Sequence, residues 1–424
     1  GRFASRLHVS LSGQTSKVNY YWSLGYLDSE GIITGDCFKN YRTNLRLDAK
    51  VTSFLEVGVN LFLQSRDEGA RGVDWGGQLR NSPYSTPYNE DGTLNPWPMG
   101  ELAQGQGVNS RYHLSMSSRS RGTKTVTGNF WAKIKLPFNV SYQFSFAPRY
   151  SWYHNREWNS SQSVFDTQNG SALRENAHSV VWTLDNMLKW NYTFADKHLF
   201  DVTLLQSAEK YEYWSENMSG NNFSPSDILQ WHNMATATNK NLGSNDEKYT
   251  GDALMARLFY SYDNRYMLTT SVRRDGYSAF GRSNPRATFP AVALAWNFSN
   301  EEFFNWKPMN SGKLRFSWGK NGNREIGMYQ ALSMLSGGAA GKYSYVRPDG
   351  TLYEVSSLEI ARMANNDLRW ESTASWNVGL DFGFLNNRIT GSVEWYFMPT
   401  TDLLMDRSLP NITGFDRILT TWDV

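Results

Sequence analysis

Five tryptophans in polar segments are the residues of this chain whose side chains are best suited to bind a ligand. They are Trp75, Trp97, Trp152, Trp158 and Trp231. Each lies among glycines, asparagines or other polar residues, which is typical of loops, and loops carry most binding residues. A flat indole face suits a sugar ring and also a peptide side chain, whereas the alternative is that these rings pack loops together. We predict that they contact the substrate or a covering partner.

No set of residues has the spacing of a catalytic or metal centre. The six histidines are dispersed, and none stands in a His-Glu-x-x-His pattern. Gly105 and Gly107 lack the third glycine and the preceding apolar strand of a dinucleotide-binding loop. The oxygen-bearing stretch 244–247 could contribute to a Ca²⁺ site, but a solvated loop tip is the simpler interpretation. We therefore predict no enzymatic activity, no cofactor, and no catalytic or metal-binding residue.

The composition excludes several classes of protein. Lys and Arg number 42 and Asp and Glu number 40, so a net charge of +2 argues against a nucleic-acid partner. Cys37 is the single cysteine, which excludes an internal disulfide framework. The sequence has no apolar run of about 18 residues, the length that a transmembrane helix needs. Aromatic residues make up 15% of the chain, which fits the aromatic girdles of outer-membrane barrels and also carbohydrate-binding surfaces.

Two segments within 41–65 alternate strictly between apolar and polar side chains. The first apolar set is Thr43, Leu45, Leu47, Ala49 and Val51, and the second is Val57, Val59, Leu61 and Leu63. Alternation with a period of two places each set on one face of a strand. Strands of about 10 residues are long enough to cross a bilayer when tilted. Because a short link at 52–54 joins the segments, they predict a transmembrane hairpin.

The pattern recurs along the chain and predicts roughly 14 or 15 strands. The expected strands are 5–13, 17–27, 41–51, 55–65, 123–136, 138–149, 179–193, 197–210, 251–262, 265–276, 287–298, 312–320 and the hairpin strands on either side of 386–387. Their apolar stripes include Trp182, Trp190, Trp376 and Trp395, which we expect to face lipid or to belong to the aromatic girdle at the membrane interface. A soluble sandwich or propeller would have strands of about 5–6 residues or a regular repeat. The pattern therefore favours an all-β, transmembrane antiparallel β-barrel.

Connections of two kinds alternate between these strands. Short turns are expected near Ser53, Pro137, Ala195, Asn264 and Asn387, and long loops at about 66–122, 150–178, 211–250 and 321–370. Outer-membrane barrels have short periplasmic turns and long extracellular loops. We therefore predict one partial transmembrane barrel over 1–424, with the short turns in the periplasm.

Several segments carry a family resemblance. They are YYWSLGYLDSEGI at 20–32, RTNLRLD at 42–48, LEVGVNL at 55–61, PYNEDGT at 87–93, KLRFSWGKNGN at 313–323, LRWE at 368–371, WNVGLDFG at 376–383, NRITG at 387–391, TTDLL at 400–404 and LPNITGF at 409–415. In this order they resemble the SusC-like (SusC/RagA-type) TonB-dependent outer-membrane transporters of Bacteroidetes. The resemblance spans nearly the whole chain and corresponds to the barrel portion of that family.

The resemblance implies a location, an activity and partners. Members of the family lie in the outer membrane of Gram-negative bacteria, and their barrels have about 22 strands. The family's plug domain and its last strands are not matched by this chain, so we expect them elsewhere in the native protein. The implied activity is active import of oligomeric nutrients, with a SusD-like surface lipoprotein as a lid and TonB–ExbB–ExbD as the energy source.

No motif distinguishes a glycan substrate from a peptide substrate, or active import from other functions of a β-barrel. The near-neutral charge and the loop tryptophans lean towards an oligosaccharide rather than an oligopeptide. A passive porin-like channel and a surface binding or adhesion protein of β architecture are the alternatives.

Overall fold

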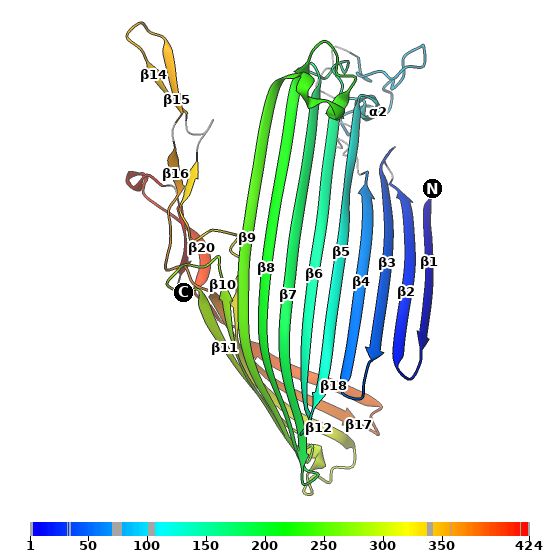
Figure 1. Ribbon diagram of the computed structural model, residues 1–424, viewed down its shortest axis with the longest axis vertical. Coiled ribbons are helices and arrows are strands. Elements are labelled where there is room, and N and C mark those ends of the chain that lie inside the picture. The colour runs from blue at the N-terminus through cyan, green and yellow to red at the C-terminus, as the bar shows by residue number, and fades with distance from the viewer. Residues whose placement is uncertain are drawn as a thin grey trace. The chain divides into compact units, whose positions relative to one another are not determined.

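The computed structural model describes residues 3–422 except 32, 34, 70–78, 101–106, 337–341, 357 and 416. The described residues contain one sheet of 15 strands. Fourteen of them follow one another in chain order, β1 to β12 and then β17 and β18, and the fifteenth, β19, pairs with β17 (Figure 1). The pairings among β1 to β4, among β9 to β12 and among β12, β17, β18 and β19 are all antiparallel. The predicted fold class and strand number are therefore confirmed.

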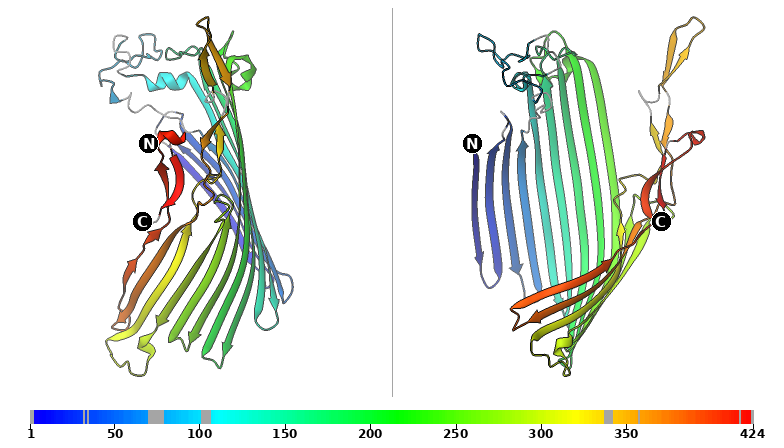
Figure 2. Two further views of the ribbon diagram at one scale, coloured as in Figure 1. Left: turned by 90° about the vertical axis from the view of Figure 1, so that its left-hand side faces the viewer. Right: turned by 180° about the vertical axis from the view of Figure 1, so that it is seen from behind.

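The chain forms two compact units, and the long strands β5 to β9 contribute to both. Unit 1 comprises Gly1–Ala132, Phe146–Trp182 and Tyr211–Lys248, and unit 2 comprises Lys133–Ser145, Thr183–Lys210 and Tyr249–Val424. Figure 2 shows the later strands of unit 2 lying side by side, from green through yellow to orange.

The strands of the main sheet include one for each predicted strand, and several of them are longer than predicted. They are β1 (Ala4–Gln14), β2 (Val18–Glu30), β3 (Cys37–Lys50), β4 (Leu55–Glu68), β5 (Ser117–Leu136), β6 (Val140–Asn159), β7 (Ser171–Phe194), β8 (His198–Phe223), β9 (Ala237–Tyr262), β10 (Tyr266–Tyr277), β11 (Arg286–Trp296), β12 (Met309–Asn323), β17 (Glu371–Phe384), β18 (Ile389–Phe397) and β19 (Thr400–Thr401). The smaller elements lie in the connections and after β19. They are α2 (Ser110–Ser115), η2 (Gln230–His232), η3 (Met234–Thr236), η4 (Phe298–Asn300), β13 (Met334–Ser336), β14 (Lys342–Val346), β15 (Leu352–Ser356), β16 (Glu359–Arg362), β20 (Leu403–Ser408), η5 (Asn411–Thr413) and β21 (Arg417–Trp422). No helix among the described residues is both long enough and apolar enough to cross a membrane.

The strand register brings the predicted apolar stripes together on one face. In unit 1, Leu45 lies opposite Leu61 and Leu47 lies opposite Val59. In unit 2, Trp318 pairs with Trp376. The stripe continues across the last hairpin, where Val378 pairs with Trp395 and Leu380 with Val393. Side chains that point the same way as these residues form the apolar face, and the alternate residues form the polar face.

The short turns have the backbone that tight hairpins require. Pairs of neighbouring residues with positive φ occupy three of them: Phe138 and Asn139, Ala195 and Asp196, and Asp263 and Asn264. Two central residues with positive φ define the type I′ turn, whose twist matches that of the flanking strands. The Arg265 amide closes one such turn by donating to the Tyr262 carbonyl over 2.8 Å. These residues confirm the predicted turns near 137, 195 and 264.

Aromatic rings crowd the short-turn end of unit 2. Tyr266 stacks on Trp296 with ring centroids 6.5 Å apart, and Trp296 Nε1 donates to Glu301 over 2.9 Å. Hydrogen bonds from Trp296 and Tyr266, together with the Arg265 guanidinium, hold the pKa of Glu301 below its usual value. Such a band of rings is typical of the membrane interface of a barrel.

The strands run further than the sequence predicts at their other ends. β6 continues to Asn159 and β7 begins at Ser171, so the predicted loop 150–178 is strand except for 160–170. Likewise, 224–236 is all that separates β8 from β9 within the predicted loop 211–250. The predicted loop 66–122 contains the end of β4 and the start of β5, and 321–370 contains β13 to β16. These loop bounds were wrong because polar residues interrupt or replace the apolar stripe in the outer strand segments, so the alternation is hidden there.

Two small hydrophobic cores lie in the long connections and the strand ends beside them, one in each unit. The unit 1 core consists of Ala172, Phe223, Trp231 and Ala237, with Trp158 and Met234 packed against it. The unit 2 core consists of Ala279, Phe280, Ile326, Ala331, Leu368 and Trp370. Each core fixes the connections that line a hollow in the same unit.

Candidate functional site

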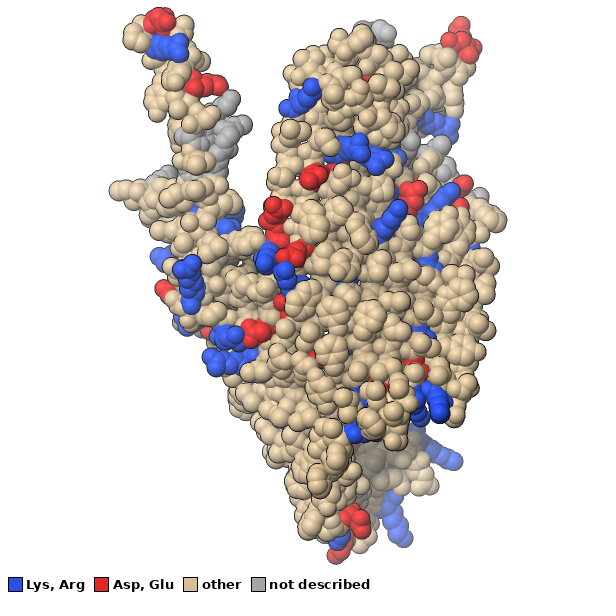
Figure 3. Space-filling model, viewed as in Figure 1, with Lys and Arg blue, Asp and Glu red and all other residues tan. Residues whose placement is uncertain are grey.

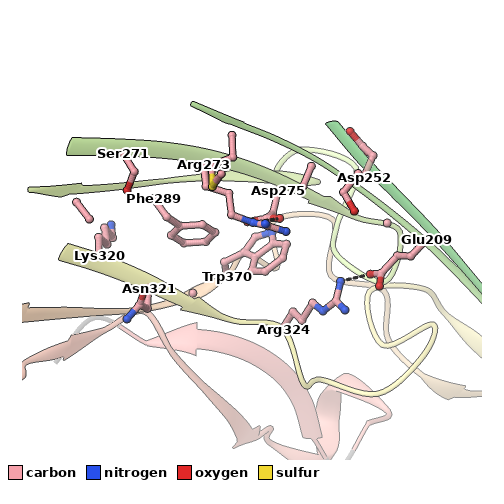
Figure 4. A pocket seen from close by; sticks show the side chains of 16 residues that line it. Glu209, Asp252, Ser271, Arg273, Asp275, Phe289, Lys320, Asn321, Arg324 and Trp370 are labelled. Carbon is pink, nitrogen blue, oxygen red and sulfur yellow. Dashed lines mark hydrogen bonds and ion pairs between the residues drawn. The ribbon is translucent and has the colours of Figure 1, made fainter. Parts of the chain in front are cut away.

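A charged hollow of about 550 Å³ in unit 2 is the strongest candidate for a ligand site. Its charged lining consists of three cations and three anions, namely Arg273, Lys320, Arg324, Glu209, Asp252 and Asp275. Ser207, Ser271 and Asn321 add neutral polar groups, and Phe289 and Trp370 form an aromatic wall (Figure 4). A charge-balanced lining of this kind suits a polar ligand without a large net charge.

Alternation along the strands positions the side chains of the charged hollow. Arg273 and Asp275 are two residues apart on β10, so they point to the same face. Arg273 Nε donates to both carboxylate oxygens of Asp275, over 2.8 and 2.9 Å. Because both bonds use Nε, the two Nη groups of Arg273 remain available to a ligand.

Arg324 follows the end of β12 and closes another side of the hollow. Its guanidinium forms an ion pair with Glu209 of β8, drawn as a dashed line in Figure 4. It also lies 5.0 Å from the centre of the Tyr277 ring, in cation–π geometry. The hydrogen bond with Glu209 raises the pKa of Arg324, which keeps this side chain charged.

The unit 2 core holds the aromatic wall in place. Trp370 is only 5% exposed and stacks on Phe280 with ring centroids 4.8 Å apart. Gly322 makes this packing feasible, because a Cβ at this position would lie 2.1 Å from the Phe289 ring. Trp370 therefore acts as a wall rather than as an exposed stacking surface.

A second hollow, of about 400 Å³, lies in unit 1. Five amide side chains line it, Asn159, Gln168, Asn221, Asn239 and Asn241, and Glu157 and Lys240 add one charge of each sign. Asn239 donates to Asn221 over 2.8 Å, and Asn221 donates to Gln168 over 3.1 Å. Asn159 donates to Ser171 over 3.2 Å at another side. Amide groups both donate and accept hydrogen bonds. This amide hollow can therefore recognise hydroxyl groups of a neutral ligand.

The structure does not bring the predicted tryptophans together in either hollow. Trp75 lies outside the described residues. Trp97 packs edge-on against Phe165, with ring centroids 4.7 Å apart, and Trp231 is 9% exposed within the unit 1 core. Trp152 and Trp158 were predicted in a loop, but both lie in β6. Their contact with a substrate or partner remains a prediction.

Trp152 illustrates why the local composition is misleading. Its ring is 40% exposed and stacks on that of Tyr150, two residues earlier on the same face of β6. Polar neighbours such as Ser151 and Asn155 belong to the other face of this strand, which is why the segment resembles a loop. The stretch 244–247, interpreted as a loop tip, likewise lies within β9.

The residues of the two hollows were not identified from the sequence. Both sets are assembled from several strands, so no local spacing marks them. One sequence signal could have indicated the amide hollow. Asn239 and Asn241 are two residues apart, so alternation along a strand places both on one face.

Comparison with known proteins identifies the family. A TonB dependent receptor-like β-barrel family matches residues 12–422. A TonB-dependent receptor of Formosa agariphila is 26% identical over 423 residues, covering 98% of this chain and 39% of the relative. The TonB-dependent receptor SusC of Bacteroides thetaiotaomicron is 27% identical over 447 residues, covering 97% of this chain and 42% of the relative. The chain thus spans about two fifths of the length of these relatives.

Solved structures share the fold. The RagAB peptide transporter matches with a TM-score of 0.83 at 22% identity, over 98% of this chain and 46% of the other. FpvA of Pseudomonas aeruginosa, bound to heterologous pyoverdines, gives a TM-score of 0.53 at 13% identity, over 99% of this chain and 50% of the other. These structures agree with the strand order of the sheet. The family match over residues 12–422 shows that the chain belongs to the TonB dependent receptor-like β-barrel family of the outer membrane.

Proposed function

We propose that the whole protein imports an oligomeric nutrient across the outer membrane, driven by TonB–ExbB–ExbD. Membership of the receptor family supports this proposal, as does the similarity to SusC over 97% of the chain. A SusD-like surface lipoprotein acts as the lid over the extracellular loops. The proposed transport involves no covalent chemistry by the barrel, so its residues act by binding and release.

The amide hollow carries the proposal for the substrate class, which is a neutral oligosaccharide. Asn221, Asn239 and Gln168 form a chain of amides, and planar polar side chains of this type suit the neighbouring hydroxyls of a sugar ring. The balanced charges of the unit 2 hollow are compatible with the same ligand. The tryptophans contribute little to this argument, because Trp158 and Trp231 belong to a hydrophobic core.

An oligopeptide is the second candidate, and the charged hollow favours it. Arg273 and Asp275 present opposite charges side by side, which would suit the charged ends and side chains of a peptide. The RagAB peptide transporter has the same fold, with a TM-score of 0.83. At 22% identity, however, this likeness concerns the fold alone.

Growth on single polymers distinguishes these substrates. A strain lacking the full gene should lose growth on one polysaccharide, and the full-length protein should restore it only in cells with functional TonB. Loss of growth on protein-derived oligopeptides alone would refute the glycan proposal and leave the transporter proposal intact. Growth that is equal with and without TonB would indicate a passive channel instead.

The topology follows from the connections. We propose that the short turns near Ser53, Pro137, Ala195, Asn264 and Asn387 are periplasmic and that the connections within 66–122, 211–250 and 321–370 are extracellular. Single cysteines at Lys240 and Asn387, each in a Cys37→Ser background, test this in intact cells. A membrane-impermeant thiol reagent should label position 240 and spare position 387, and the reverse result would overturn the topology.

A further inference from the structure

A hollow of about 640 Å³ lies on the apolar face of unit 2 and shares only Met255 of its lining with the charged hollow. Its lining is mostly aliphatic and includes Leu188, Leu204, Leu254 and Val272. Figure 3 shows few charged side chains over the unit 2 lengths of β7 and β8. In the barrel family this face is in contact with lipid, so the hollow opens towards the bilayer.

Three polar side chains cross this aliphatic surface. The Tyr142 hydroxyl donates to Asn186 Oδ1 over 2.6 Å, and Asn186 Nδ2 donates to Gln206 Oε1 over 2.7 Å. Within the described part of the chain, Gln206 Nε2 has no hydrogen-bond acceptor. A donor left unpaired against hydrocarbon costs free energy. The Gln206 amide, the last group in this series of hydrogen bonds, therefore needs an acceptor from outside the protein.

A cation stands at the edge of the same hollow. Arg274 lies opposite Leu254 in the register of β9 and β10, and its guanidinium forms no hydrogen bond or ion pair within the described residues. An adjoining hollow of about 450 Å³ shares Gln206, Leu254 and Arg274 and adds Arg286. It meets the charged hollow at Ser207, Asp252 and Ala253. Arg286 is paired with Asp252. The edge thus carries two cations and one anion, a net positive charge.

These charges lie where the apolar band of the strands ends, at the boundary of the hydrocarbon layer. On β10 the apolar face reads Tyr266, Leu268, Thr270 and Val272 before it reaches Arg274. The eight residue steps from Tyr266 to Arg274 span about 27 Å along the strand. At the usual strand tilt this is about 20 Å across the bilayer, close to the apolar band of about 25 Å. Arg274 therefore lies at the level of the lipid headgroups, with the aliphatic hollow on its membrane side.

We propose that the two adjoining hollows bind a phosphorylated lipid of the outer leaflet. Arg274 and Arg286 hold the phosphate, because guanidinium groups bind phosphate with strong charge-assisted hydrogen bonds. The Gln206 amide donates to a carbonyl oxygen of the lipid, and an acyl chain fills the surface formed by Leu188, Leu204 and Val272. The unpaired guanidinium and the unpaired amide thus both find acceptors in one lipid molecule.

Lipid retention by the full-length transporter tests this proposal. The wild type, the double variant R274Q/R286Q and the control R257Q are extracted in mild detergent, and bound lipid is measured by native mass spectrometry. Arg257 lies on the other face of β9, so the control removes a cation of the same type outside the hollow. We expect the double variant to retain about tenfold less phosphorylated lipid, and R257Q to match the wild type.

A titration checks that the phosphate is the recognised group. Added lipid A with two phosphates should bind to the wild type, whereas dephosphorylated lipid A should bind at least several-fold more weakly. An R274K variant should recover part of the binding. Equal retention by wild type and double variant would overturn the proposal, as would an equal loss in R257Q. A change from dimer to monomer in R274Q/R286Q without lipid loss would instead indicate a second copy on this surface and also refute it.

Discussion

The two ligand-sized hollows on the polar strand positions differ in how they are built. The amide hollow of unit 1 depends on side chains that hydrogen-bond to one another, such as Asn221 and Asn239. The charged hollow of unit 2 depends on ion pairs and on the buried Trp370 behind them. We therefore expect ligand binding in the charged hollow to depend on salt and on an intact unit 2 core. Binding in the amide hollow should depend on neither.

The largest expected effect comes from removing the wall of the charged hollow. Trp370→Ala opens a cavity in the unit 2 core, and such truncations cost about 3–5 kcal/mol. We expect faster hydrogen exchange around Phe280 and Ile326, with loss of uptake, while exchange around Trp231 in unit 1 stays unchanged. Trp395→Ala, on the apolar face of β18, is the control. Unchanged protection in the Trp370 variant would show that the hollow does not depend on this core.

The ion pair of the charged hollow gives a smaller effect. Glu209→Gln leaves Arg324 without its carboxylate partner, and because the Arg324 side chain is 40% exposed we expect a cost of about 1–2 kcal/mol, below that of a buried pair. Uptake should fall and should become less dependent on salt than in the wild type. The matched control is Glu247→Gln on β9, outside the hollow. If the uptake by Glu209→Gln depends on salt as much as uptake by the wild type, the ion pair plays no part in substrate binding.

The amide hollow should respond differently. Asn221→Ala removes one acceptor and one donor of the amide chain, and a neutral hydrogen bond contributes about 1 kcal/mol. We expect roughly fivefold weaker substrate binding to the full-length protein by calorimetry, with the same loss at low and high salt. Asn245→Ala, an exposed asparagine of β9, should bind normally. A loss that disappears at high salt would show that charge governs this hollow too.

The smallest effect concerns a short turn and should leave both hollows unchanged. Ala195 has a φ of +50°, a conformation that costs an alanine about 1 kcal/mol relative to glycine. Ala195→Gly should therefore raise the thermal midpoint of the detergent-solubilised protein by a few degrees or less, with unaltered substrate binding. A lower midpoint would contradict the assigned turn conformation.

The sequence predicts best where a strand meets two different environments. Leu45 and Leu61 alternate with polar residues because one face contacts lipid and the other water, and the hairpin that pairs them was correctly predicted. The asparagine-rich start of β9 has polar side chains on both faces, so neither periodicity nor composition distinguishes it from a loop. The hollows were missed for a different reason. Glu209 and Arg324 are far apart in sequence and meet only through the strand order and the packing of the unit 2 core.

The strand order has a consequence for how the sheet is assembled. From β1 to β12 each strand pairs with the strand made just before it, so each step closes only the connection between neighbours. Closing a loop costs an entropy that grows slowly with its length, and local pairings form fastest. The growing sheet then exposes one new edge at a time, and the next strand of the same chain is always the nearest one to cover it. This order shortens the time for which an open edge can recruit a foreign strand and aggregate.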